Sequence, residues 1–103
     1  MDKIIIDCKA IKSKDELHKL IKSKMNFPEY YGNNLDALHD CLTDITAETE
    51  IEVKNVEKFG AGFFGRLFKT EKYLQAQEYA GKLMLCLDET AEESDGKIKI
   101  TYA

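Results

Sequence analysis

Three aspartates stand four residues apart in the middle of the chain, at Asp36, Asp40 and Asp44. On a helix this spacing places the carboxylates on one face, where each like-charged pair costs about 0.2 to 0.5 kcal/mol. Only Asp36 would lie in a first turn, where the helix dipole favours a negative charge, and no lysine compensates the row. The row is therefore unfavourable for the helix itself. It indicates either a tolerated solvated face or a surface that binds a positively charged partner.

Paired carboxylates can also serve an enzyme, as an acid and base pair or as ligands of a divalent metal. Asp36 and Asp40 would be that pair here. A convex helix face lacks a cleft that excludes water and raises one pKa, and no conventional nucleophile and base pair is recognisable nearby. We therefore expect a binding protein and not an enzyme, with no catalytic residue, no metal and no cofactor.

Two adjacent tyrosines, Tyr30 and Tyr31, precede the aspartate row. Their large amphipathic side chains are of the kind that anchors protein interfaces. His39 lies inside the row, close to Asp36 and Asp40, where its ring is available to hydrogen bond with a partner. These residue types together favour a protein-binding surface.

The formal net charge of −4 arises in one segment. Residues 1–24 carry seven lysines and four acidic residues, and residues 54–103 carry eight basic and eight acidic residues. Residues 25–53 hold seven acidic side chains and no lysine or arginine. A negative field of this size repels nucleic acid and anionic membranes and attracts basic partners. A solvated face that serves solubility alone is the other interpretation of the same count.

The length of 103 residues predicts a single domain over residues 1–103, and a hydrophobic fraction of 44% is sufficient for one core. No apolar run approaches the roughly 20 residues that cross a bilayer, and the first residues lack a signal-peptide pattern, so we expect a cytoplasmic protein. Cys8, Cys41 and Cys86 are odd in number and lack the spacing of metal ligands. We expect them to be buried, reduced thiols.

Three segments have strand patterns. Residues 3–8 contain three consecutive isoleucines, which predicts a central strand covered on both faces. Residues 49–56 and 97–102 alternate polar and apolar side chains, as strands with one wetter face do.

A first helix is expected between the first two strands. Ser13 and Glu16 fit a capping box, apolar residues then follow at helical spacing, and the helix ends near Met25. We expect His18 to lie on the surface of this helix.

The second helix carries the aspartate row. A turn at residues 30–32 precedes it, Asn33 or Asn34 caps it, and it ends at Thr43 or Ile45. Its core face is formed by Leu35, Leu38, Leu42 and Ile45.

The second half of the chain predicts two more helices. A hinge at residues 60–62 precedes apolar residues at helical spacing, and Ala80 with Gly81 forms a second break. The apolar residues are Phe63, Phe64, Leu67, Phe68 and Leu74, of which we expect the first four to pack in the core. Residues 82–94 are best interpreted as a helix ending at Asp95 and Gly96, although residues 83–87 are apolar enough for a buried strand. The fold class is then α/β: a small three-stranded parallel sheet with right-handed crossovers and about four helices.

The segment 27–43 reads FPEYYGNNLDALHDCLT. It resembles the signature PEYYGxNLDALxDCLT of the barstar-like family, the intracellular inhibitors of the secreted ribonuclease barnase. The resemblance implies the family's fold and a binding surface made by the second helix and the loop before it. The resemblance also implies that Asp40 takes the place of a substrate phosphate among the ribonuclease's Arg, Lys and His groups. By the same alignment Asp36 corresponds to the family's second charge-pairing aspartate, and Tyr30 to the tyrosine that packs on the ribonuclease's catalytic histidine. The candidate partner-binding residues are Tyr30, Tyr31, Gly32, Asn34, Leu35, Asp36, His39, Asp40, Thr43 and Asp44.

The chain departs from the family pattern at two aromatic positions. His39 stands in place of a tryptophan in the motif, and Ile45 replaces the next aromatic residue, so the surface is more acidic and less aromatic. Family members also use an acid from the last helix, for which Glu92, Glu93 and Asp95 are candidates.

The resemblance implies a monomer that binds a small basic extracellular ribonuclease of the barnase type as a 1:1 heterodimer, without nucleic acid or membrane partners. The alternative is a binding module that kept the scaffold but binds another basic protein, without inhibiting a ribonuclease.

Overall fold

A three-stranded parallel sheet in the order β1-β2-β3 organises the chain, of which the computed structural model describes residues 2–60 and 67–103. Ile4, Ile51 and Ile100 stand side by side in its register, which aligns the apolar positions of all three strands on one face. The predicted parallel α/β sheet is confirmed. The strands are β1 (Asp2–Asp7), β2 (Thr49–Lys54) and β3 (Ile98–Tyr102).

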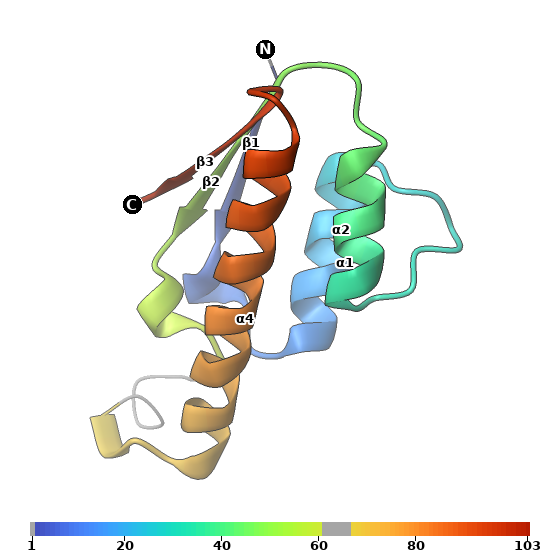
Figure 1. Ribbon diagram of the computed structural model, residues 1–103. Coiled ribbons are helices and arrows are strands. Elements are labelled where there is room, and N and C mark those ends of the chain that lie inside the picture. Colours follow the sequence, from blue (N-terminus) through green and yellow to red (C-terminus); the bar gives the residue numbers. More distant parts are fainter. Residues whose placement is uncertain (1, 61–66) are drawn as a thin grey trace.

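The three α-helices that the described residues form are α1 (Lys14–Met25), α2 (Leu35–Thr43) and α4 (Glu71–Glu93). Two short 3-10 helices, η1 (Cys8–Ala10) and η2 (Val56–Lys58), follow the first two strands. The α-helices gather on one side of the sheet: α1 contacts β1, α4 contacts β3, and α2 lies against α4 (Figure 1). The second helix is thus an outer element, with one face toward the core and one toward solvent.

The sheet has one buried and one open face. Ile6, Ile51 and Val53 are buried beneath the helices. Ile5 points the other way and is 37% exposed, and β1 is an edge strand paired only with β2. The prediction of a central strand covered on both faces is therefore wrong, because the β-branched run supplies β propensity whether or not a second layer covers it.

The start of α1 follows its predicted capping box. The Ser13 hydroxyl accepts a hydrogen bond from the Glu16 amide at 3.2 Å, and the Glu16 carboxylate accepts one from the Lys12 amide at 2.8 Å. Asn26 ends the helix in the left-handed conformation, with φ of 56°. His18 was expected on the surface, but it is fully buried with 0% exposure.

The last helix is a single element. Thr70 caps it, and Ala80, Leu83 and Leu87 form its buried stripe. The predicted break at Ala80 and Gly81 is wrong, because burial of the stripe on either side holds Gly81 in the helix. Residues 83–87 are helical, as the preferred interpretation had it.

The apolar residues expected to pack in the core before this helix do not do so where they are described. Leu67 and Phe68 are both exposed, as is Leu74 at the start of α4. Phe63, Phe64 and most of the predicted hinge at 60–62 lie outside the described residues.

All three cysteines are free thiols. Cys8 is buried as expected, whereas Cys41 and Cys86 are only half-buried. Within the described part of the chain, no helix combines the length and apolar character needed to cross a membrane.

Candidate partner-binding surface

The second helix forms because one face packs and the first turn is capped. The Asn34 side chain accepts a hydrogen bond from the Ala37 amide at 2.8 Å, which settles the cap between the two predicted asparagines. Leu38 and Leu42 are buried in the core. This packing fixes which side of α2 faces solvent.

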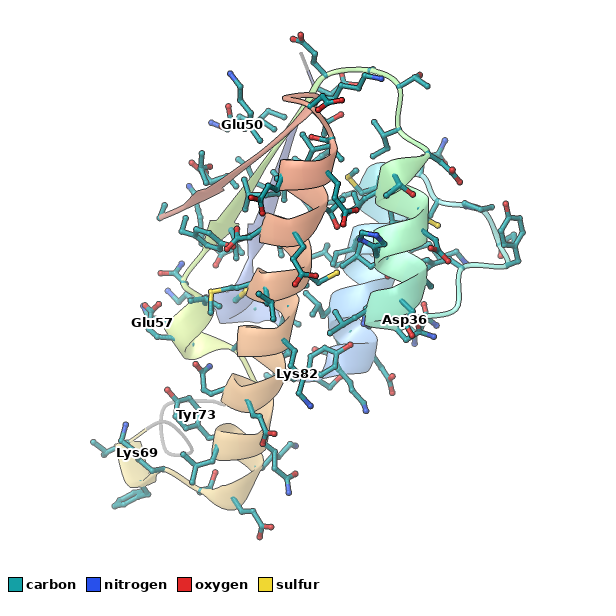
Figure 2. All side chains as sticks on the ribbon, in the orientation of Figure 1. Asp36, Glu50, Glu57, Lys69, Tyr73 and Lys82 are labelled. Carbon is teal, nitrogen blue, oxygen red and sulfur yellow. The ribbon has the colours of Figure 1, made fainter. Side chains whose placement is uncertain are left out.

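The aspartate row lies on that solvent side. Asp36, Asp40 and Asp44 are exposed, and within residues 2–60 and 67–103 none of them forms an ion pair. Asp36 projects from α2 away from the sheet (Figure 2). The three carboxylates are therefore positioned by α2 and have no compensating cation among the described side chains, an arrangement suited to a positively charged partner.

From the sequence, the solvent-exposed face of α2 was expected to be convex. The structure instead has a depression beside it. A groove of about 490 Å³ runs between α2 and α4. Its lining comprises Leu35, Asp36, His39, Asp40, Cys86, Glu89 and Glu93. Four carboxylates from two helices therefore surround one depression.

Of the three acids predicted to contribute from the last helix, only Glu93 lines this groove. Sequence reasoning missed Glu89, which stands four residues before Glu93 and hence on the same helix face. That spacing was the available signal, but it becomes informative only once α4 is known to lie beside α2.

His39 contacts α4 and not the aspartates of its own helix. Its Nδ1 lies 2.8 Å from Thr90 Oγ1, and its Nε2 lies 3.3 Å from Glu93 Oε2. The Thr90 hydroxyl already donates to the Cys86 carbonyl at 2.8 Å, so it accepts from His39 Nδ1–H. A hydrogen bond from Nε2 to Glu93 then requires the doubly protonated imidazolium. The histidine thus joins the two helices at the groove.

The two tyrosines before α2 have different environments. Tyr30 is 85% exposed, whereas Tyr31 is only 5% exposed and packs against Phe27, with 5.1 Å between the ring centroids. The turn before α2 was predicted at residues 30–32, but it spans residues 28–31. The Tyr31 amide donates to the Pro28 carbonyl at 3.0 Å. The prediction of two surface anchors is therefore corrected: Tyr30 is accessible to a partner and Tyr31 is part of the core.

Three further candidate residues shape the ends of α2. The Gly32 carbonyl accepts from Asn34 Nδ2 at 3.2 Å, and a Cβ at Gly32 would lie 3.4 Å from that of Ala37. The nearer neighbour of such a Cβ would be Asn34 Nδ2 at 3.2 Å, so glycine leaves room for the side chain that caps α2. At the other end, the Thr43 hydroxyl donates to the Asp40 carbonyl at 2.7 Å and so provides a hydrogen bond to one of the last carbonyl groups of α2.

The acidic segment 25–53 does not form one continuous face. Glu50 and Glu52 lie on the open face of the sheet, where both contact Lys3 and Glu52 also contacts Lys54, at 3.6 to 3.9 Å. Figure 2 shows Glu50 beside the strands and Asp36 on the far side of the helices. Of the acids in this segment, Asp36 and Asp40 line the groove, and α4 supplies its other two carboxylates.

Comparison with known proteins agrees with these features. Residues 1–102 match the family described as Barstar (barnase inhibitor). The chain is also 37% identical, over 101 residues and 97% of each chain, to the Bacillus subtilis (strain 168) protein named "Putative ribonuclease inhibitor YrdF". Both descriptions name inhibitors and neither names an enzyme, in agreement with the expectation of a non-enzymatic protein. The chain belongs to the barstar family.

Proposed function

We propose that this chain inhibits a small basic secreted ribonuclease of the barnase type, by binding it one to one and covering its active site with α2 and the preceding loop. The observation that carries the proposal is the row of exposed carboxylates on a packed helix beside the exposed Tyr30, a row that forms no ion pair with any residue that the structure describes. Family membership and the name of the Bacillus subtilis relative support the same function.

The physical basis is mimicry of a phosphate. A ribonuclease holds its substrate phosphate with cationic side chains, and a carboxylate aimed into such a pocket accepts charge-assisted hydrogen bonds there. Asp40 occupies the middle of the row and is the carboxylate that we assign to the pocket. Asp36, Glu89 and Glu93 then face the basic rim from the groove, and Tyr30 packs its ring against the ribonuclease surface.

The proposal also gives the protein a place in the cell. An inhibitor that stays in the cytoplasm as a monomer protects the cell that makes the ribonuclease until the enzyme has been exported. Opposite charges on the two proteins accelerate their encounter, so association is fast and sensitive to salt.

Titration of ribonuclease activity tests the function directly. A guanyl-preferring ribonuclease of the barnase type is mixed with increasing amounts of the purified protein, and the remaining activity is measured. We expect a linear loss that reaches zero at one equivalent, and an association rate that falls steeply between about 0.05 and 0.5 M salt. Full activity at a tenfold excess of the protein would refute the proposal for that class of enzyme.

A second function is favoured by one observation. His39 bridges Thr90 and Glu93 at the groove, in the position of a family tryptophan, and so presents a polar surface where an aromatic one is expected. A barstar scaffold with this groove suits a basic protein partner other than a ribonuclease. Capture of such a partner from the native cell by the wild-type chain, and not by Asp40→Asn, together with no inhibition of ribonuclease, would favour this function.

A further inference from the structure

His18 is a fully buried histidine with both ring nitrogens in hydrogen bonds. Its Nδ1 lies 2.6 Å from the Tyr31 hydroxyl, and its Nε2 lies 2.6 Å from the Tyr79 hydroxyl. The residue belongs to α1, Tyr31 belongs to the loop before α2, and Tyr79 belongs to α4. One imidazole therefore connects the loop of the candidate binding surface to the two longest helices.

The connection depends on a neutral ring. A neutral imidazole has one N–H donor and one acceptor nitrogen, so one tyrosine accepts from the ring and the other donates to it. Protonation removes the acceptor, which leaves one buried hydroxyl hydrogen without a partner and places a charge in the core. Burial lowers the pKa of His18 and thereby favours the neutral form.

Among the described residues, no charged group in contact with the His18 ring compensates for its protonation. The titratable groups that face this part of the core are Asp15 and Lys14 of α1, Cys41 of α2 and Cys86 of α4. Asp15 and Lys14 act on His18 in opposite directions, and the pKa values of both thiols are raised, mainly by burial.

The loop has few other attachments. Tyr31 is the one buried side chain of residues 26–34, and Phe27, half-buried, packs against it. The two ends of the loop are tied to the helices, by the Phe27 amide that donates to the Lys22 carbonyl at 3.0 Å and by the Asn34 cap of α2. Between these ends there is an exposed ion pair of Lys22 and Glu29 at 3.3 Å, and pairs of that kind contribute little. The position of the exposed Tyr30 is thus determined by its buried neighbour.

We propose that His18 is a positioning residue for partner binding, which holds the loop carrying Tyr30 and Gly32 through its hydrogen bond to Tyr31, while its other ring nitrogen bonds to Tyr79 of α4. The inference rests on the proposed function where binding is concerned. The order of the loop, in contrast, is a property of the free protein and can be measured without any partner.

Two matched variants separate positioning from general stability. Tyr31→Phe and Tyr79→Phe each remove one hydroxyl from His18 and keep the ring, but only the first releases the loop. We expect similar decreases in the urea midpoint. In the free protein, we expect hydrogen exchange of the loop amides to accelerate at least about tenfold in Tyr31→Phe and less than about twofold in Tyr79→Phe, because loop opening is a local event.

The binding readout uses the barnase-type ribonuclease. We expect its complex with Tyr31→Phe to dissociate at least about fivefold faster than the wild-type complex, and the Tyr79→Phe complex to dissociate at nearly the wild-type rate. Absence of wild-type inhibition would refute the proposed function while the exchange measurement still decided whether His18 orders the loop. The inference would be overturned if both variants accelerated loop exchange equally, or if Tyr31→Phe did not change loop exchange.

Acidification of the wild-type protein gives a third readout that needs no variant. His18 has a lowered pKa in the folded state, so its contribution to stability is fully present above about pH 6.5 and is lost as the pH falls. We expect loop exchange, corrected for the intrinsic rate, to rise below pH 6.5 before exchange in α4 does. Simultaneous acceleration in both segments would contradict a local role.

Discussion

Replacement of Asp40 by asparagine should stabilise the free protein and weaken its complex, two effects of opposite sign from one change. In the free protein Asp40 is exposed, has no ion pair among the described residues and lies four residues from both Asp36 and Asp44. Its removal relieves two like-charge pairs of about 0.2 to 0.5 kcal/mol each and an unfavourable charge near the end of a helix. We expect the free energy of unfolding to rise by about 0.5 to 1 kcal/mol.

In the complex the same carboxylate is desolvated among cationic groups. Truncating one partner of a buried, hydrogen-bonded charge pair costs about 2 to 5 kcal/mol, because the opposing charges are left buried and unpaired. The dissociation constant for a barnase-type ribonuclease should therefore rise by about 30-fold to about 5,000-fold. Urea unfolding of the free variant and titration of ribonuclease activity measure the two effects separately.

Glu50→Gln is the matched control, since it makes the same change in net charge on the opposite side of the molecule. Glu50 contacts Lys3 at 3.6 Å on the open face of the sheet, a surface pair worth at most about 1 kcal/mol. We expect it to slow association slightly through the weaker overall field and to leave the dissociation rate unchanged. If both variants weakened binding equally, only the total charge would matter and the assignment of Asp40 would be wrong.

Four other changes test separate parts of the structure. Tyr30→Ala should change the urea midpoint little, since the side chain is exposed, yet weaken ribonuclease binding by at least about 2 kcal/mol in the same titration. Gly81→Ala should raise the free energy of unfolding by about 0.5 to 1 kcal/mol, because nothing lies within 4 Å of the added methyl group on α4. Gly60→Ala should lower it by more than about 2 kcal/mol, because φ is +85° there and the new Cβ would overlap that of Ala76. Burial raises the pKa of the Cys8 thiol from 9.0 to about 11, so its contribution to stability is fully present below pH 9 and is lost as the pH rises. The free energy of unfolding should fall by about 2 kcal/mol between pH 9 and pH 11, a decline that Cys8→Ala should remove.

The features that could be predicted from the sequence are local ones. Ser13 with Glu16 marked the start of α1, and the asparagines before Leu35 marked the start of α2, because capping chemistry acts over three or four residues. The alternation of polar and apolar residues in β2 and β3 likewise predicted which of their side chains face the core. The fold class followed from the order of these elements and from the family motif.

The features that could not be predicted depend on partners distant in sequence. Tyr30 and Tyr31 have identical side chains, but only Tyr31 forms a hydrogen bond with the buried His18. That histidine lies in α1, 13 residues earlier in the sequence. Gly81 looks like a helix break until the buried stripe of α4 is known. Glu50 belongs to the acidic segment by sequence, but a parallel strand places Lys3 beside it.

The acidic groove exists because core packing is stronger than the repulsion it creates. Leu38 and Leu42 of α2 share one buried cluster with Leu83 and Leu87 of α4, and each fully buried leucine contributes about 1.5 to 3 kcal/mol. Like-charged neighbours on a helix cost only about 0.2 to 0.5 kcal/mol per pair.

The leucines therefore hold the two helices together although four carboxylates meet at their exposed edges. The fold tolerates this repulsion without relieving it, since the described residues bring one histidine and no lysine or arginine to the groove lining. A basic partner would relieve the repulsion among these carboxylates. The loss of that repulsion therefore adds to the favourable free energy of association. For the same reason, charge removal at Asp40 should stabilise the fold and weaken the complex together.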